Sequence, residues 1–263
     1  METLTLGPLT VRRVVKAGGT SENRGDNRGG GPPRARTRES GQSPLVLVLA
    51  HGFGAPGDDL VGLADEIDVP VGTVMIFPEA LLGLREVLGQ PMFGDARAWW
   101  LIDFARLELA IARGEARDLS GEVPDGLAEA RAAYSDMLDA LAKEVPTDRL
   151  VLGGFSQGSM LSVDVALRQP ERKISGLVIL SGTMVAEHEW KPLMSERARR
   201  QPRMPVFQSH GRSDAILPFS IAERLRDSLT SSGFDVTFDP FAGPHTITPT
   251  TLKALNAWLH RLP

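Results

Sequence analysis

Residues 150–158 read Leu-Val-Leu-Gly-Gly-Phe-Ser-Gln-Gly and decide the fold. The apolar run at 150–152 predicts a buried strand, and residues 160–167 have the pattern of a helix. A Gly-x-Ser-x-Gly pentapeptide between a strand and a helix is typical of a sharp turn that lifts the serine hydroxyl clear of a sheet. Ser156 is therefore the candidate nucleophile.

Short β-rich apolar runs alternate with helical patterns on both sides of this segment. Near-continuous apolar strands are buried on both faces. Strands of this kind separated by helices of about ten or more residues imply crossover connections. We predict an α/β fold with a mostly parallel central sheet and helices on both faces. The predicted strands are residues 45–50, 74–77, 150–155, 176–180, 205–209 and 236–238.

Several helices have recognisable signals. Thr248 followed by Pro249 predicts an N-cap and a first helical residue, and Ser220 with Glu223 predicts a capping box. Apolar residues recur at helical spacing after Pro124 and after Thr248, so both helices are expected to bury one face in the core. These residues are Leu127, Ala130, Tyr134, Leu138 and Leu141 in the first helix and Leu252, Leu255, Trp258, Leu259 and Leu262 in the second.

The chain before residue 45 divides into two parts. Residues 1–16 alternate polar and apolar side chains, which predicts a strand or hairpin. Residues 17–44 are rich in Gly, Arg, Ser and Pro and predict a flexible loop, because they bury too little apolar surface to offset their ordering entropy. An Arg-Gly nucleic-acid tail is the alternative, although such tails are usually terminal and longer. Residues 45–263 are expected to form the catalytic domain.

The composition excludes several kinds of chemistry. The chain has 263 residues and no cysteine, so disulfides, thiolate metal sites and a cysteine nucleophile are excluded. A formal charge of −4 gives no electrostatic reason to expect nucleic acid as a partner. No run reaches about 18 apolar residues, and the N-terminus lacks a basic cap before an apolar block. We expect a cytoplasmic protein without stable membrane insertion, and make no prediction of its oligomeric state.

A serine nucleophile needs a base, usually a histidine oriented by a carboxylate. With this kind of turn the chain order is serine, acid, histidine, each on a loop after a strand. His245 follows the last predicted strand and precedes the final helix, so it is the candidate base. His51 precedes the serine, and His210 lies in a His-Gly pair that closes a strand. His188 lies in a polar connection without an obvious preceding strand, and His260 lies inside the final helix.

The candidate acid is Asp214, which lies just past one predicted strand and just before a helix. Asp239 competes with it, because it also follows a strand. However, Asp239 lies only six residues before His245, and the adjacent Pro240 is typical of a strand end. We favour Asp214.

Acyl transfer also requires two backbone N–H groups that bind the oxyanion. The N–H of Gln157, directly after the nucleophile, is the first. The second is expected from Phe53, within the glycine-rich segment that follows strand 45–50. The alternative for this segment is a tight turn without a catalytic role. This chemistry requires no metal and no cofactor.

Four segments share motifs with a known group of proteins: His51-Gly-Phe-Gly54, Gly154-Phe-Ser-Gln-Gly158, His210-Gly-Arg-Ser-Asp214 and Gly243-Pro-His245-Thr246. Together they resemble the phospholipase/carboxylesterase family, which includes the acyl-protein thioesterases, over about residues 44–262. Arg97-Ala-Trp-Trp100 also looks like a family segment near the pocket. The resemblance implies an α/β-hydrolase fold with Ser156, Asp214 and His245 as its catalytic triad. The chain departs from the family at Ser159 and Pro244, where glycine is more usual.

The acyl pocket is expected to be apolar, as ligand sites largely are. Trp100 and Leu217 are the candidate pocket residues, because strand-like alternation sends Trp99 to the opposite side. The depth of the pocket is expected to depend on how connection 186–203 folds over it.

The predicted function is a serine carboxylic ester hydrolase that cleaves small or medium acyl esters through an acyl-enzyme on Ser156. An acyl-thioester or lysophospholipid hydrolase of the same family is the first alternative. A non-catalytic binding protein with this fold is the second.

Overall fold

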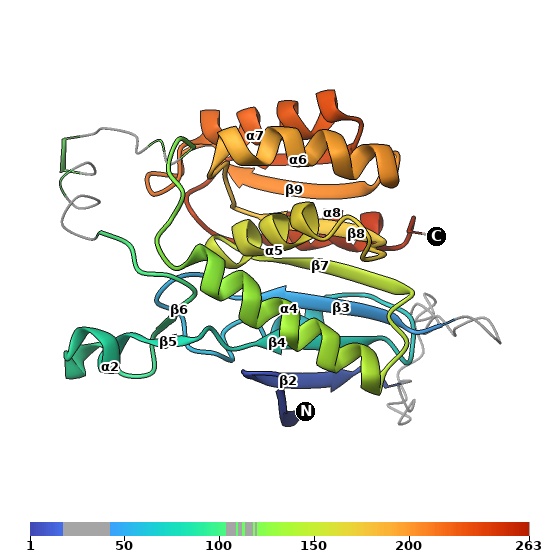
Figure 1. The fold of residues 1–263 in the computed structure, drawn as a ribbon, viewed down its shortest axis with the longest axis horizontal. Helices are drawn as coiled ribbons and strands as arrows, with labels where there is room; N and C mark the ends of the chain where they lie inside the picture. The colour runs from blue at the N-terminus through green and yellow to red at the C-terminus, as the bar shows by residue number, and fades with distance from the viewer. Residues whose placement is uncertain (18–42, 104–108, 110–111, 114–117, 119, 263) are drawn as a thin grey trace, which may run out of the picture.

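A computed structural model of the protein describes residues 1–17, 43–103, 109, 112–113, 118 and 120–262. The main strands in this part of the chain are β1 (Glu2–Leu6), β2 (Leu9–Val15), β3 (Leu45–Ala50), β4 (Val74–Pro78), β7 (Arg149–Phe155), β8 (Gly176–Leu180), β9 (Pro205–Gly211) and β10 (Asp235–Phe241). They form one eight-stranded sheet in the order β1-β2-β4-β3-β7-β8-β9-β10 (Figure 1). The β1/β2 and β2/β4 pairs are antiparallel and the others are parallel. The predicted mostly parallel sheet is confirmed.

Shorter elements and helices surround this sheet. A small two-stranded sheet pairs β5 (Leu82–Gly83) with β6 (Arg97–Ala98), and a 3-10 helix, η1 (Pro91–Phe93), lies between them in sequence. The described helices are α1 (Leu63–Glu66), α2 (Leu84–Leu88), α4 (Leu127–Glu144), α5 (Gln157–Arg168), α6 (Glu187–Arg200), α7 (Phe219–Ser232) and α8 (Pro249–Leu259).

Strand β3 shows why both faces of the sheet carry helices. All its residues are buried, and successive side chains point to opposite faces. Val46, Val48 and Ala50 belong to one apolar cluster, to which α4, α5, α6 and α7 contribute. The alternate leucines at 45, 47 and 49 belong to a second cluster with α1 and α8. Figure 1 shows α4 and α5 in front of the sheet and α8 behind it.

The N-terminal residues form a hairpin that extends the sheet. In it, β1 pairs with β2, and β2 pairs antiparallel with β4. The turn between the strands approaches α4 closely: a Cβ on Gly7 would lie 2.9 Å from the carbonyl carbon of Asp136. Within the predicted loop at 17–44, residues 18–42 lie outside the described part of the chain.

Of the two predicted helix starts, the one at Thr248 is confirmed and the one at Ser220 is wrong. The Thr248 hydroxyl accepts a hydrogen bond from the Thr251 N–H, and α8 begins at Pro249, as predicted. The predicted capping box at Ser220 is wrong, because α7 begins at Phe219 and its N-cap is Pro218, two residues before the predicted one. The Pro218 carbonyl accepts from the N–H groups of residues 221 and 222, which places Ser220 inside the first turn.

Connection 186–203 is largely the helix α6, which buries Trp190, Met194 and Arg197. The Arg197 guanidinium donates to the carbonyl oxygens of Gln169 at 2.7 Å and Arg172 at 2.9 Å. Burial lowers the pKa of Arg197 to about 10. This side chain therefore fastens α6 to the chain that leaves α5.

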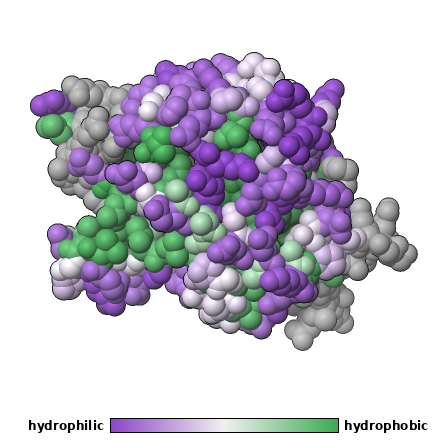
Figure 2. Space-filling view, in the orientation of Figure 1, coloured by the Kyte–Doolittle hydropathy of each residue, from purple (hydrophilic) through white to green (hydrophobic). Residues whose placement is uncertain are grey.

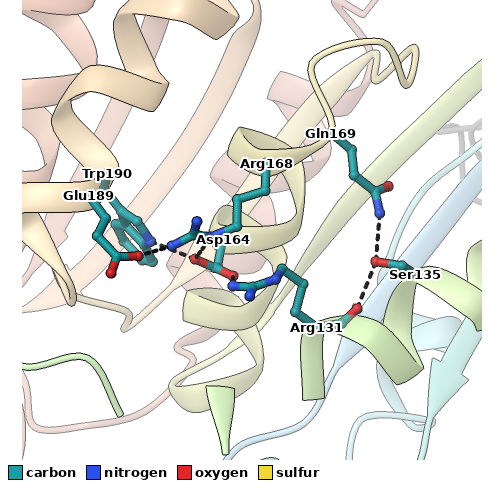
Figure 3. Close-up of polar contacts among 7 residues, drawn as sticks. All are labelled: Arg131, Ser135, Asp164, Arg168, Gln169, Glu189 and Trp190. Carbon is teal, nitrogen blue, oxygen red and sulfur yellow. Dashed lines mark hydrogen bonds and ion pairs between the residues drawn. The ribbon is translucent and has the colours of Figure 1, made fainter. Parts of the chain in front are cut away.

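A buried carboxylate joins three of the helices that cover one face (Figure 3). Asp164 of α5 is fully buried and accepts from Arg131 of α4 at 2.7 Å and from Arg168 at 3.1 Å. The indole N–H of Trp190 in α6 donates to the same carboxylate at 2.8 Å. Arg168 also pairs with Glu189. Because α5 begins directly after the candidate nucleophile, this network fixes the helix that carries the site.

Replacing Asp164 with alanine is expected to lower the free energy of unfolding by about 3 kcal/mol, because two arginines and one indole N–H lose a buried acceptor. Both arginine side chains keep about a quarter of their surface exposed, so water offsets part of the loss. Asp139→Ala is the matched control, since Asp139 pairs with Arg172 but is 62% exposed; about 1 kcal/mol or less is expected. Urea unfolding measures both, and equal losses would contradict the assigned role.

Candidate active site

Ser156 lies on a strained turn between β7 and α5. Its φ of 52° and ψ of −121° are unusual for a residue with a side chain and cost on the order of 1–3 kcal/mol. The Ser156 N–H donates to the Leu180 carbonyl at 2.8 Å, which ties the turn to the neighbouring strand. Such strain is typical of the turn predicted from the Gly-x-Ser-x-Gly motif.

The two motif glycines allow this turn to press against β3. A Cβ on Gly154 would lie 2.2 Å from the Ala50 carbonyl oxygen. A Cβ on Gly158 would lie 2.2 Å from the same oxygen and 2.5 Å from the His51 carbonyl oxygen. Both contacts are to backbone, which cannot move aside as a flexible side chain does.

Gly158→Ala is therefore expected to lower the free energy of unfolding by about 3 kcal/mol, the upper end for adding a methyl group to a packed interior. Gly62→Ala is the matched control, because a Cβ at Gly62 would meet nothing within 4 Å. Urea titration of both variants checks this expectation. A Gly158→Ala protein as stable as the control would show that the close approach is unimportant.

Ser159, one departure from the family pattern, supports the turn. Its side chain is buried, and its hydroxyl donates to the Ser156 carbonyl at 2.7 Å. A glycine there would supply no such hydrogen bond. The departure therefore adds a contact at the base of the turn.

Asp214 and His245 form a direct hydrogen-bonded pair. Asp214 lies on the loop after β9, and its Oδ2 accepts from Nδ1 of His245 at 2.6 Å. Its Oδ1 accepts from the N–H groups of Ile216 at 2.9 Å and Leu217 at 2.8 Å. Burial opposes ionisation of this carboxyl, but hydrogen bonds from His210, His245 and the Leu217 N–H outweigh it and hold the pKa of Asp214 well below its ordinary value. The carboxylate is thus ionised and aimed at the histidine.

The competing acid, Asp239, does not contact His245. It lies within β10, where its Oδ2 is buried and has no hydrogen-bond partner among the described residues. Its strand register pairs it with Ser209 of β9. The structure therefore brings Asp214, and not Asp239, to the histidine.

The loop that carries His245 is fastened to its neighbours at several points. The Ser213 N–H donates to the Gly243 carbonyl at 3.1 Å, which joins the acid loop to the histidine loop. The Ser181 hydroxyl donates to the Thr246 carbonyl at 3.2 Å. The rings of Phe155 and His245 lie 4.7 Å apart. Sequence reasoning missed Ser181, because no motif signals a contact between residues so far apart in the chain.

The glycine-rich segment after β3 lies beside the nucleophile. A Cβ on Gly52 would lie 3.3 Å from the Ser156 Cβ, and the next residue, Phe53, lines the same cavity as Ser156. His51 joins this segment to the chain after β4. Its Nδ1 contacts the Gly52 carbonyl at 2.8 Å, and its Nε2 accepts from the Ala80 N–H at 3.0 Å. Both ring nitrogens therefore contact backbone groups, which gives His51 a structural role, and burial lowers its pKa.

The side chain of Gln157 binds the backbone of Trp99 and Trp100, and Trp100 lines the cavity. Its Oε1 accepts from the Trp99 N–H, and its Nε2 donates to the Trp100 carbonyl, both at 2.9 Å. As the first residue of α5, Gln157 has no acceptor for its own N–H within the helix. The sequence predicted a role for this backbone N–H but missed the role of the side chain.

The candidate nucleophile, base and oxyanion donors all line one apolar cavity of about 300 Å³. Trp100 and Leu217 line it, whereas Trp99 packs against Tyr134 with ring centroids 5.8 Å apart. Residues 186–203 contribute nothing to the described lining, so the expectation that they set its depth is wrong; Val185 just before them does contribute. The described lining residues are Gly52, Phe53, Trp100, Ile102, Pro124, Phe155, Ser156, Gln157, Met160, Val185, Ile216, Leu217 and His245.

The surface around the cavity is apolar as well. Leu101, Val123 and Ile216 are each more than 40% exposed and lie in the lining or next to it in sequence. Figure 2 shows apolar surface gathered near α2 and β6, while the surface over α6 and α7 is mainly hydrophilic.

In the described ranges, no group of three His, Cys, Asp or Glu side chains could hold a metal ion. No described helix has the length and apolar character needed to cross a bilayer.

Comparisons with known proteins agree with this geometry. Acyl-protein thioesterase 1 of Eremothecium gossypii is 37% identical over 195 residues, which cover 71% of this chain and 73% of that protein. Acyl-protein thioesterase 1 of Cryptococcus neoformans is 30% identical over 149 residues, and the match spans 51% of this chain and 61% of the relative's length.

The structure of Zea mays acyl-protein thioesterase 2 superimposes with a TM-score of 0.63 at 23% identity and covers 85% of this chain and 96% of that one. Together with the mostly parallel sheet, it shows the α/β-hydrolase fold. The model of the phospholipase/carboxylesterase family matches residues 37–262. The chain therefore belongs to the phospholipase/carboxylesterase family of hydrolases.

Proposed function

We propose that this protein is a serine carboxylic ester hydrolase that cleaves small or medium acyl esters through an acyl-enzyme on Ser156. One observation carries the proposal: Ser156 and His245 line the same cavity, and the far ring nitrogen of His245 is held 2.6 Å from the Asp214 carboxylate. A serine hydroxyl, an imidazole and a carboxylate in this relation form a nucleophile, a base and the group that orients the base.

The reaction proceeds in two halves. His245 Nε2 removes the Ser156 proton as the hydroxyl oxygen attacks the ester carbonyl, and the resulting imidazolium gives that proton to the departing alcohol. In the second half, water attacks the acyl carbon as His245 removes its proton, and the imidazolium then gives that proton to the Ser156 oxygen as the acyl–oxygen bond breaks, which releases the acid and restores the free serine. Throughout, Asp214 accepts from Nδ1 of His245 and so keeps the proton-accepting nitrogen toward Ser156.

The backbone N–H groups of Gln157 and Phe53 are the proposed oxyanion donors. Gln157 begins α5, where the helix dipole and an unshared N–H both favour negative charge. Phe53 belongs to the segment whose glycine at 52 approaches Ser156. The side-chain hydrogen bonds of Gln157 hold this donor and the cavity wall in one arrangement.

The cavity supports an apolar acyl group of limited size. Its volume of about 300 Å³ lies at the lower end of the range for small-molecule sites. Trp100 and Leu217 are the proposed pocket residues, and the exposed Ile216 continues the apolar surface outward. This fits a short or medium acyl chain with its leaving group in solvent.

Acyl thioesters are a second candidate substrate class, because the curated relatives are named acyl-protein thioesterases. The same nucleophile, base and oxyanion donors serve both bonds. A panel of p-nitrophenyl esters of increasing chain length, matched acyl thioesters and lysophospholipids separates the classes. We expect the highest kcat/KM for small or medium acyl esters, and a maximum for thioesters or lysophospholipids would replace this assignment.

A fluorophosphonate probe tests the reaction type itself. Rapid labelling of Ser156, located by peptide mass spectrometry, is expected for an activated serine. Folded protein that stays unlabelled would instead support a non-catalytic binding protein with this fold.

A further inference from the structure

A second imidazole touches the carboxylate of Asp214. His210 is the penultimate residue of β9, and its side chain is completely buried. Its Nε2 lies 2.9 Å from the Leu217 carbonyl oxygen and 3.2 Å from Asp214 Oδ2. Oδ2 of Asp214 therefore lies between two imidazoles, His245 on one side and His210 on the other.

The hydrogen-bond partners determine what His210 contributes. A carbonyl oxygen only accepts, so the contact with Leu217 requires a proton on Nε2 of His210. The other ring nitrogen, Nδ1, is buried and has no partner in the described part of the chain. His210 is not among the residues that line the cavity, so it does not reach the substrate. It acts as a donor at Nε2, shared between two acceptors.

That shared N–H joins two parts of the site. The Asp214 carboxylate is held at Oδ1 by two backbone N–H groups, and His210 adds a fixed donor at Oδ2 beside the one from His245. The second acceptor is the carbonyl of Leu217, whose side chain lines the cavity. One buried donor thus contacts both the candidate acid and the backbone of the cavity wall.

We propose that His210 is a positioning residue for the ester hydrolysis: its Nε2–H fixes the plane of the Asp214 carboxylate, and through it the His245 imidazole, while holding Leu217 against the cavity. This inference rests on the proposed function. Without the His210 donor, Oδ1 keeps its two backbone hydrogen bonds. The remaining bond from His245 to Oδ2 does not fix the plane of the carboxylate, so the carboxylate turns with the imidazole and no longer holds its orientation. The hydrogen bond goes to a charged group, and the loss of one such bond corresponds to roughly a 10- to 100-fold change.

Two amide variants test the role with matched chemistry. In His210→Gln, the amide nitrogen can reach the former position of Nε2, whereas in His210→Asn the amide is too short to do so. We expect kcat per active site to fall about 10- to 100-fold in His210→Asn, with a smaller change in KM, and to return most of the way in His210→Gln. His210→Phe, which keeps a ring and removes the donor, is expected to resemble His210→Asn. Titration with the fluorophosphonate gives the concentration of active sites. Because kcat is calculated from that concentration, unfolded protein does not lower its value.

The pH profile supplies a readout that a purely structural role would leave unchanged. The titratable groups in contact with the Asp214 carboxyl are His210 and His245. With one donor fewer, the carboxylate stabilises the His245 imidazolium more strongly. The acid limb of the kcat/KM profile is therefore expected to move to higher pH in His210→Phe and His210→Asn.

Two results would overturn the inference while leaving the proposed function intact: wild-type kcat per titrated site in the asparagine and phenylalanine variants, or a glutamine variant no better than asparagine. An acid limb at the wild-type pH in all variants would also count against it. If wild-type protein fails to label at Ser156, the proposed function itself fails, so the two failures are distinguishable.

Discussion

Ser156→Ala is expected to reduce kcat about a millionfold, because removing the nucleophile disables the whole triad, as it does in other serine hydrolases. In the proposed mechanism, this hydroxyl is the protein group that forms a bond to the acyl carbon. The cavity, the oxyanion donors and the Asp214–His245 pair stay in place, so KM should change far less than kcat. Initial rates on a p-nitrophenyl ester, with enough enzyme to detect the residual rate, measure the loss.

Ser195→Ala is the matched control for this substitution. Ser195 is exposed on α6, its hydroxyl donates to the Lys191 carbonyl at 3.3 Å, and it is not among the residues that line the cavity. The control should retain wild-type kcat. A Ser156→Ala protein that keeps a tenth or more of the wild-type rate would show that another residue performs the reaction.

Asp214→Asn is expected to lower kcat about 10⁴-fold, the loss found when the triad aspartate of a serine protease becomes asparagine. The hydrogen bonds explain the direction. Oδ1 accepts from two backbone N–H groups, so the asparagine oxygen takes that place and its NH₂ faces Nδ1 of His245. Histidine then holds its proton on Nε2 and cannot accept one from Ser156.

Asp239→Asn is the control for this second variant, because Asp239 also follows the pattern of an acid after a strand but does not contact the histidine. It should keep kcat within a few-fold of wild type. A loss in Asp239→Asn that equals the loss in Asp214→Asn would reopen the choice of acid.

The same carboxylate has a consequence for stability. Its pKa is lowered in the folded protein, so Asp214 contributes stability above its unfolded pKa of about 3.9 and loses that contribution as the pH falls through the lower, folded value. The difference in unfolding free energy between wild type and Asp214→Asn should therefore shrink as the pH falls below about 4. Urea titrations at stepped pH test this. A difference that grows as the pH falls below about 4 would contradict the lowered pKa.

Much of the fold could be predicted because its strands are buried on both faces. Runs such as residues 45–50 and 176–180 are apolar throughout, and the strands match those bounds. Strands β9 and β10 continue past their apolar runs to residues 211 and 241, because parallel pairing with each other satisfies the backbone N–H and C=O groups there. Hydrophobicity alone gives no sign of that extension.

Helix α6 was missed for a physical reason. Its buried stripe consists of Trp190, Met194 and Arg197, and the last of these is charged. Pro192 lies inside the helix and reads in a sequence as a helix breaker. The burial of Arg197 depends on carbonyl oxygens of another segment, at residues 169 and 172, so only the folded chain shows it.

The site shows the same division. Chain order was enough to select Ser156, Asp214 and His245 as candidates. Each lies after a strand, and the carboxyl ends of parallel strands meet at the same edge of a sheet. The supporting contacts of Ser181, His210 and the Gln157 side chain were not predicted. Each joins residues on different loops through a single hydrogen bond, which leaves no periodic pattern in the sequence.

The most direct test of the central claim is intact-protein and peptide mass spectrometry of enzyme quenched with acid during turnover of a short p-nitrophenyl ester. We predict an added acyl mass on the peptide that contains Ser156, its accumulation in Asp214→Asn only at a strongly reduced rate, and its absence in Ser156→Ala. An acyl group found on another residue, or the same adduct in Ser156→Ala, would contradict the account.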